Sequence, residues 1–345
     1  MKKLIALMVM AVLSVTNSAY DYCNKTTVNI KSEQSDTVTI TFTGDCTLGG
    51  YKGQGTSGNY NEYFDNYGAD YFFDSVRDIF KSDDLTFINL EGPITSRQTT
   101  VNKQFPISCR PEHIDILTNS SIEVCSLANN HTLDCGVDGL NDTISALADN
   151  NIGFCYNENI SIHNIDGIRV ACLAYNGWNT DKELMTNIEN NIKSCKNSGV
   201  SIVCIMFHWG NERENYSNSV QETLAHHAVD CGADIVIGNH PHVMQGIEKY
   251  NGKTILYSLG NFTFGANKNP KDKDTFIFQQ EFIVNVDGTI EYGNETIIPC
   301  SISSSKDKNT YQPTPLVEDD ATRVINRLIK YSSKYKETLE MLEEK

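Results

Sequence analysis

Short apolar runs alternate with amphipathic stretches from residue 37 onward. Seven of the runs are rich in Val, Ile and Phe and have the length of β-strands. They cover residues 38–43, 85–90, 122–127, 168–174, 202–207, 234–237 and 254–259. A further run at 276–284 stands outside the alternation and predicts a strand in a mixed sheet or a second sheet.

Helical periodicity fills the intervals between these runs. In the segment 71–81 the residues Phe72, Val76, Ile79 and Phe80 share one side, and the segment 138–149 starts with the capping residue Asp138. Helices are also expected at about 181–197 and 217–231. Strands that alternate with helices favour an α/β fold in which helices pack on a largely parallel sheet.

The remaining segments define the domain limits. Residues 20–36 are polar and predict a loose N-terminal segment before one main domain at 37–300. Within that domain, residues 50–70 are rich in Gly, Tyr and Asn and predict a long loop, either a surface insertion or a lid over a site. The Ser, Lys and Pro content of 301–318 predicts a linker, and 319–344 reads as a C-terminal helix that completes the segment 301–345.

The first nineteen residues have the features of a secretory signal peptide. Lys2 and Lys3 precede an apolar run at 4–15, and small or polar residues follow at 16–19. The run is short for a membrane span, so we expect a secreted or cell-surface protein, with an uncleaved anchor as the alternative. Export permits disulfides, but the eleven cysteines are scattered, and Cys172 and Cys204 lie in apolar runs typical of buried thiols.

Composition narrows the classes of partner. With 345 residues, 39% hydrophobic and 21% charged, the chain reads as a soluble globular protein. Its formal net charge of −16 argues against nucleic acid as a partner. An anionic or phosphoester-like substrate, or an acidic surface polymer, would need local positive charge, which bound metal cations would supply.

Polar residues with metal-binding chemistry follow five of the predicted strands. Because sites in open α/β sheets lie at the carboxyl ends of the strands, these side chains should gather on one edge. A carboxylate, amide and imidazole set without cysteine suits Mn, Fe or Zn, and two such ions can activate a water. A single Asp or His at a strand end is more often a turn or cap residue, so the prediction rests on the whole set: Asp45, Glu91, Asn130, His131, His208, His240 and His242.

The motifs around these residues also carry a family resemblance. GDCTLGG, INLEGPIT, SLANNHTLDCGVDGL, FHWGNE, GADIVIGNHPHVMQGIE and YSLGNFTF resemble, in order, the motifs of the CapA-like poly-γ-glutamate capsule synthesis proteins. The resemblance spans about residues 37–285. That family is related to the calcineurin-like metallophosphoesterases, so the resemblance implies a metallophosphoesterase-like α/β sandwich with mixed sheets and helices on the outer faces, around two divalent metal ions.

The resemblance also implies a role for each residue. Asp45 and His242 would bind one ion, Glu91 would bridge, and Asn130, His208 and His240 would bind the other. His131 would face the substrate as an acid or electrostatic stabiliser, with Asp134 orienting it. Glu212 and Asn261 would support the site or touch substrate, and Arg110 is a candidate anion contact. The chain departs from the wider superfamily at Thr47, where a His is common, and at Glu91, where an Asp is common.

Three functions follow as hypotheses. The first is an exported CapA-like protein of capsule or poly-γ-glutamate-type polymer biosynthesis that hydrolyses phosphoester-like bonds with its metals. The second is a non-catalytic metal-binding or polymer-binding partner in synthesis or export, in a polymer-synthesis membrane complex. The third is a different surface hydrolase on the same scaffold, for which the 50–70 segment would set the substrate.

Overall fold

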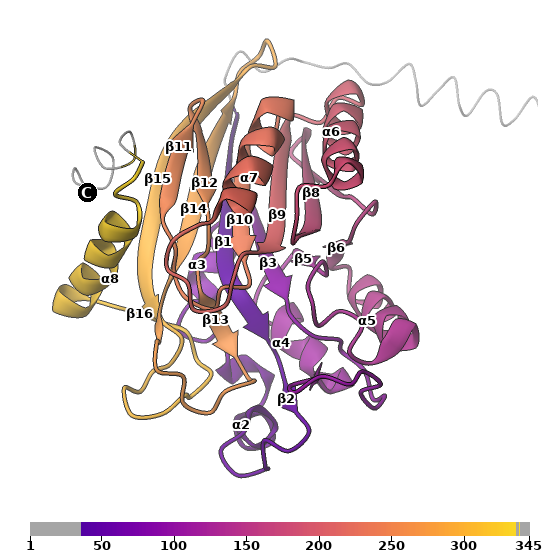
Figure 1. Cartoon of the computed structure of the whole chain (residues 1–345), viewed down its shortest axis with the longest axis vertical. Helices are drawn as coiled ribbons and strands as arrows, with labels where there is room; N and C mark the ends of the chain where they lie inside the picture. The colour runs from indigo at the N-terminus through magenta and orange to yellow at the C-terminus, as the bar shows by residue number, and fades with distance from the viewer. Residues whose placement is uncertain (1–35, 336–337, 339–345) are drawn as a thin grey trace, which may run out of the picture.

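Two mixed β-sheets pack face to face in the computed structural model, which describes residues 36–335 and 338 (Figure 1). In the first sheet, four strands run parallel: β1 (Asp36–Thr47), β3 (Leu85–Leu90), β5 (Val124–Ser126) and β6 (Gly153–Cys155). β13 (Asn261–Phe264) is parallel to the end of β1. An antiparallel extension follows through β14 (Asp274–Val284), β15 (Ile290–Ser301) and β16 (Thr314–Pro315).

The second sheet has a parallel centre and antiparallel edges. Its centre holds β8 (Ile168–Gly177), β9 (Ile202–Trp209), β10 (Ile235–Asn239) and β12 (Lys253–Leu256). β7 (Ser161–Ile165) and β11 (Ile247–Tyr250) close its two sides. A separate ribbon joins β2 (Gly50–Tyr51) to β4 (Ile107–Ser108).

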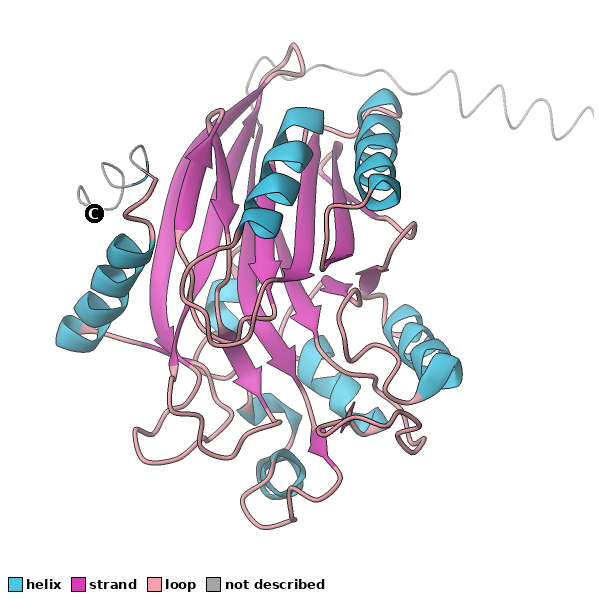
Figure 2. Ribbon diagram, in the orientation of Figure 1, coloured by secondary structure: helices cyan, strands magenta, loops and turns pink. Residues whose placement is uncertain are grey.

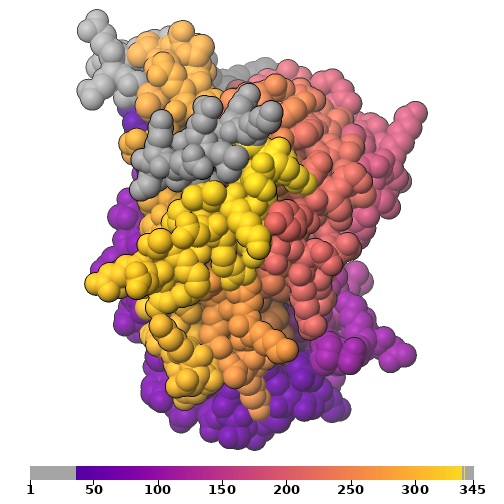
Figure 3. Space-filling model, turned by 60° about the vertical axis from the view of Figure 1, so that its left-hand side comes forward, coloured from indigo at the N-terminus to yellow at the C-terminus, as the bar shows by residue number. Residues whose placement is uncertain are grey.

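Helices cover the outer faces of the two sheets (Figure 2). The first sheet is covered by α2 (Tyr60–Tyr67), α3 (Arg77–Lys81), α4 (Ile114–Thr118) and α5 (Gly136–Asp149), with short 3-10 turns η1 (Ala69–Tyr71) and η2 (Pro111–His113). The second is covered by α6 (Lys182–Asn197) and α7 (Ser219–Cys231). α8 (Glu318–Tyr331) lies against β15 and β14 and buries Val324 and Leu328 (Figure 3).

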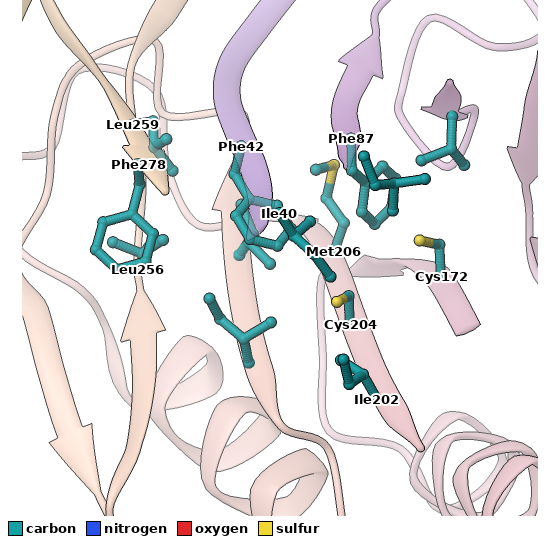
Figure 4. Close-up of a cluster of buried hydrophobic side chains, with 14 of the residues drawn as sticks. Ile40, Phe42, Phe87, Cys172, Ile202, Cys204, Met206, Leu256, Leu259 and Phe278 are labelled. Atoms are coloured by element: carbon teal, nitrogen blue, oxygen red, sulfur yellow. The ribbon is translucent and has the colours of Figure 1, made fainter. Parts of the chain in front are cut away.

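The period of two along each strand explains this layering. In β9, Ile202, Cys204 and Met206 point into the core between the sheets, where they meet Phe42 and Phe278 of the first sheet (Figure 4). The intervening residues of β9 point outward and pack under α6 and α7. Because these strands are buried on both faces, they appear in the sequence as continuous apolar runs, and the runs predicted the strands well.

The structure confirms all seven predicted strands, the strand at 276–284 and the helices at 181–197 and 217–231. Asp181 and Asn218 cap those two helices through their side chains. The helix predicted at 138–149 is confirmed as α5, but it begins at Gly136, so the expectation that Asp138 caps its start is wrong. The predicted helix at 71–81 is reduced to η1 and α3. The strands form two mixed sheets and not the single largely parallel sheet that their alternation with helices favoured, which confirms the α/β sandwich with mixed sheets that the resemblance implied.

Two segments predicted from polar composition are packed into the domain. Within residues 50–70, the helix α2 buries Tyr60 and Tyr63, so only part of this segment is loop. Within 301–318, Tyr311 is fully buried and β16 pairs with β15, so this stretch is built into the first sheet and not a free linker. Aromatic residues scattered among polar ones carry no clear period, and for that reason composition misread both segments.

The described cysteines are all free. Cys172 and Cys204 pair in register on β8 and β9 and lie in the core between the sheets, which confirms their reading as buried hydrophobic groups. The predicted signal peptide at 1–19, residues 20–35 of the expected loose segment and the end of the expected C-terminal helix lie outside the described residues. None of the helices in the described part of the chain combines the length and the apolarity that a membrane span requires.

A half-buried carboxyl pair makes stability depend on pH. Burial raises the pKa of Glu123 from 4.5 to about 7 and that of Asp83 to about 6. Both accept hydrogen bonds from Thr86, at 2.7 Å from its backbone N–H and 2.8 Å from its hydroxyl. Because folding disfavours the ionised forms, the stability they contribute is present at acid pH and lost as the pH rises towards 7.

We predict that Glu123→Gln raises the free energy of unfolding by about 1–2 kcal/mol near neutral pH and above, and by much less near pH 4. Glutamine keeps the acceptor for Thr86 N–H but cannot ionise. Urea unfolding across this pH range measures the difference, with the exposed Glu158→Gln as the matched control. A gain that is equal at acid and alkaline pH would contradict the assignment.

Candidate metal centre

The carboxyl ends of strands from both sheets converge at one end of the sandwich. β1 supplies Asp45, the turn after β3 supplies Glu91, and the loop after β5 supplies Asn130. From the second sheet, β9 supplies His208 and the turn after β10 supplies two imidazoles. Those two residues, His240 and His242, have φ angles of 97° and 57°, in the left-handed region that strains the backbone of a non-glycine residue.

Asp45, Glu91 and His242 form the first group of ligand atoms, all within 4.8 Å of one another. Asp45 Oδ2 lies 3.1 Å from His242 Nδ1. The same carboxylate accepts the backbone N–H of His240 at 3.2 Å, so the turn after β10 is tied to the end of β1. Both carboxylates are fully buried.

A second group lies beside the first. His208 Nε2 is 2.9 Å from Asn130 Oδ1 and 3.1 Å from His240 Nδ1. These three atoms come from three different strand ends, and His208 and His240 are both buried. The residues expected to hold one ion and those expected to hold the other thus form two adjoining groups.

Glu91 connects the two groups. Its Oε1 atom is buried and has no hydrogen-bond partner among the described residues. It lies 3.7 Å from His208 Nε2, 3.8 Å from His242 Nε2 and 3.9 Å from His131 Nε2. Two ligand atoms that share one ion at about 2.0–2.2 Å each lie about 3–4 Å apart, so this spacing fits a bridging carboxylate. The other oxygen accepts the Thr47 hydroxyl at 3.2 Å.

Burial and charge set the protonation of the cluster. Burial lowers the pKa of His240 to about 4 and that of His208 well below its usual value, and nearby imidazoles add to both effects. Both rings are therefore neutral, the form that binds metal. Burial also lowers the pKa of His242, but Glu91 and Asp45 outweigh it and the net shift is upward. Burial raises the pKa of Glu91.

His131 stands at the edge of the cluster, with its orientation fixed by Asp134. Its Nδ1 lies 2.6 Å from Asp134 Oδ2, so its Nε2 faces Glu91. Asp134 is fully buried and also accepts Lys103 Nζ at 2.7 Å and Ile107 N–H at 2.7 Å. Burial raises the pKa of Asp134, but these hydrogen bonds outweigh it and hold the pKa below its usual value.

A cavity of about 830 Å³ opens beside the cluster. His131, His242 and Asn261 line its inner end, and Tyr51, from the 50–70 segment, lines a wall. In a strongly acidic chain, this cavity gathers basic side chains. Its other lining residues include the aromatic side chains Phe105 and Phe264 and the cations Arg213, Lys268 and Lys271.

The structure brings most of the predicted site residues together. Asn261 Oδ1 lies 2.9 Å from His242 Nδ1, and Glu212 lines the cavity. Arg110 is the exception: its guanidinium bonds Asp65 at 2.6 Å, and it lines a separate cavity of about 570 Å³. The structure therefore does not bring Arg110 to this centre, and its role as an anion contact stays a prediction. The metal-binding roles themselves stay predictions.

Several supporting residues gave no usable signal in the sequence. Asn89 donates to Asp45 Oδ1 at 2.8 Å and accepts from Asn129 Nδ2 at 3.2 Å, all in the buried interior. Lys103 also bonds the backbone carbonyl of Asn130. Asn89 and Asn129 lie inside the motifs INLEGPIT and SLANNHTLDCGVDGL, but neither was assigned a role, and Lys103 lies in a polar loop where it does not stand out.

The fold and the cluster together define the structural class of the protein. It is an α/β sandwich of two mixed sheets with a carboxylate–imidazole cluster at the strand ends. Sequence comparison gives the family. The profile of the bacterial capsule synthesis protein family PGA_cap matches residues 39–266, and the chain belongs to this family. It is similar to the PGA biosynthesis protein CapA of Bacillus subtilis strain 168, with 31% identity over 286 residues, 77% of this chain and 73% of that protein.

Further comparisons agree with the family or show weaker likeness. The capsule biosynthesis protein CapA of Bacillus anthracis is 29% identical over 332 residues, 88% of this chain and 76% of that protein. A hypothetical protein of Thermus thermophilus superposes with a TM-score of 0.48 at 13% identity, over 76% of this chain and 98% of that chain. A purple acid phosphatase from yellow lupin seeds superposes with a TM-score of 0.35 at 11% identity, over 84% of this chain and 56% of that chain.

We predict that Lys103→Met lowers the free energy of unfolding by about 1–2 kcal/mol at neutral pH. The buried Asp134 carboxylate would lose one partner, although Lys103 is partly exposed and water compensates some of the loss. Urea unfolding tests this, with the exposed Lys52→Met as the control. The difference should shrink at acid pH as Asp134 becomes protonated, and a pH-independent difference would show that Lys103 acts through packing alone.

Proposed function

We propose that this protein is an exported metal-dependent hydrolase that cleaves phosphoester-like bonds in capsule-type polymer biosynthesis. The observation that carries the proposal is the buried Glu91 Oε1 atom, which has no hydrogen-bond partner among residues 36–335 and 338 and faces three imidazole nitrogens at 3.7–3.9 Å. A buried acceptor of this kind is costly unless a partner satisfies it. A divalent cation is the partner that fits a mixed carboxylate and imidazole set.

The ligand assignment follows the two groups. Asp45, Glu91 and His242 would hold one ion. Asn130, His208 and His240, with Glu91 shared, would hold the other. Such ions would polarise a phosphoryl oxygen and lower the pKa of a bound water. The absence of cysteine among these ligands favours Mn, Fe or Zn in an oxygen and nitrogen environment.

The chain itself supplies orientation and proton transfer. Asp134 holds Nδ1 of His131, which leaves Nε2 directed at the cluster and the cavity. In its protonated form, His131 can donate that Nε2 proton to a leaving oxygen, as a general acid does. Asn261 accepts from His242 and fixes the orientation of that imidazole.

The cavity suits an anionic substrate. Three cations line it, Arg213, Lys268 and Lys271, and they outnumber its two carboxylates, Glu212 and Asp272. In a chain whose net charge is −16, this local excess of positive charge offsets the general repulsion of anions. Tyr51 and Phe105 meet edge to face at 4.9 Å and form an aromatic wall.

A non-catalytic role is the second candidate, and Thr47 favours it. At this position the wider superfamily commonly has a ligating His, whereas here the Thr47 hydroxyl donates to Glu91 Oε2. One ion would therefore have fewer protein ligands. In this role the centre would bind an acidic polymer or a partner of a membrane synthesis complex without turning it over.

We predict that Glu91→Gln and His208→Ala lower the metal content of the purified protein and abolish metal-dependent hydrolysis of p-nitrophenyl phosphate. His131→Ala should keep the metal content and lower the rate by about 10²–10⁴-fold, the usual contribution of a general acid. Elemental analysis after supply of Mn²⁺ or Zn²⁺, together with initial rates, gives both readouts.

Arg110→Ala is the matched control, because its side chain faces the separate cavity and should change neither readout. Full metal content with no hydrolysis of any phosphoester in the wild type would favour the non-catalytic role. Hydrolysis that survives in His208→Ala with unchanged metal content would contradict the assigned centre.

A further inference from the structure

Trp178 leaves a large apolar surface open beside the cluster. It follows the end of β8 and is 45% exposed, whereas Trp209, the other tryptophan, is fully buried. Trp178 packs edge to face against two imidazoles. Its ring centroid lies 4.7 Å from that of His240 and 5.7 Å from that of His208, with angles of 82° and 85° between the ring planes. One part of the indole is thus fixed by the cluster while the rest faces solvent.

Trp178 contacts a different part of the cluster from the main cavity. His131 and His242 line the cavity, but His208, His240 and Trp178 do not. Aromatic surface therefore borders both groups of the cluster, beside His131 and His242 in the cavity and beside His208 and His240 at Trp178. The cavity side carries Tyr51, Phe105 and Phe264, and the other side carries Trp178.

We propose that Trp178 forms a second substrate subsite, which stacks on a ring-bearing group with a flat apolar face, such as an aryl or sugar ring. The inference rests on the proposed function, since it places the reacting group over Glu91. A rigid indole offers a large contact area and loses little entropy on binding. The substrate would carry substituents on both sides of the reacting phosphoryl group, so the reaction would be cleavage within a diester or a chain and not removal of a terminal phosphate.

Intrinsic fluorescence gives a first test in the unmodified protein. Because Trp209 is buried, stacked on Phe207 and bonded to the Tyr257 carbonyl, a ligand-dependent change in emission reports Trp178. With the metal-supplied protein, diphenyl phosphate should change the emission and dimethyl phosphate should not. Equal responses to the two esters, or none to diphenyl phosphate, would overturn the subsite.

Calorimetric titration of variants gives the second test. Diphenyl phosphate should bind Trp178→Ala about tenfold more weakly than wild type, and Trp178→Phe should recover most of the loss. Phenyl phosphate, whose single ring fits the cavity side, should bind Trp178→Ala and wild type equally. Tyr67→Ala, at a 60% exposed aromatic residue of α2, is the matched control and should match wild type with both esters.

The outcomes separate the two proposals. If the diphenyl phosphate pattern appears but no phosphoester is hydrolysed, the subsite stands and the hydrolase fails. If hydrolysis occurs while Trp178→Ala binds diphenyl phosphate as tightly as wild type, the subsite fails alone. Metal content is measured for each variant. If Trp178→Ala loses metal, the Trp178→Phe variant and the fluorescence of the wild-type protein decide instead. If Trp178→Ala keeps its metal but binds diphenyl phosphate and phenyl phosphate more weakly by the same factor, the arrangement with one ring on each side is overturned.

Discussion

A buried carboxylate oxygen that finds no hydrogen-bond partner in the described part of the chain is the constraint on which the rest of this structure depends. Glu91 Oε1 is enclosed by the ends of both sheets and faces three imidazole nitrogens at nearly equal distances. Desolvating such an atom is unfavourable unless it is paired. The surrounding architecture therefore makes physical sense as a cradle for cations, with neutral His208 and His240 on one side and Asp45 on the other.

The two-sheet sandwich is what makes this concentration of charge achievable. Each sheet contributes parallel strands whose carboxyl ends point to the same end of the molecule, so residues distant along the chain meet within a few ångströms. Hydrogen bonds across the gap, such as that from His240 N–H to Asp45, lock the sheets together at the cluster. The cluster is thus both a candidate site and a structural junction between the sheets.

The sequence predicted the parts of the structure in which local pattern and burial agree. Strands such as β9 are apolar on both faces, and their polar ends mark Asp45, His208 and His240 as candidates. It did not reveal Asn89, Lys103 or Trp178, because a single Asn in an apolar run, a lysine in a loop or an aromatic residue after a strand is ordinary until its neighbours are known. The α2 and 301–318 segments were misread since their buried tyrosines lie among polar residues.

Crystals of the protein supplied with Mn²⁺ or Zn²⁺, measured for anomalous scattering, test the central claim most directly. The account predicts two peaks, both within about 2.0–2.4 Å of a Glu91 oxygen, one beside Asp45 and His242 and the other beside Asn130, His208 and His240. Anomalous density elsewhere in the molecule, or a Glu91 Oε1 atom that accepts a hydrogen bond from a protein group with no ion nearby, would contradict it.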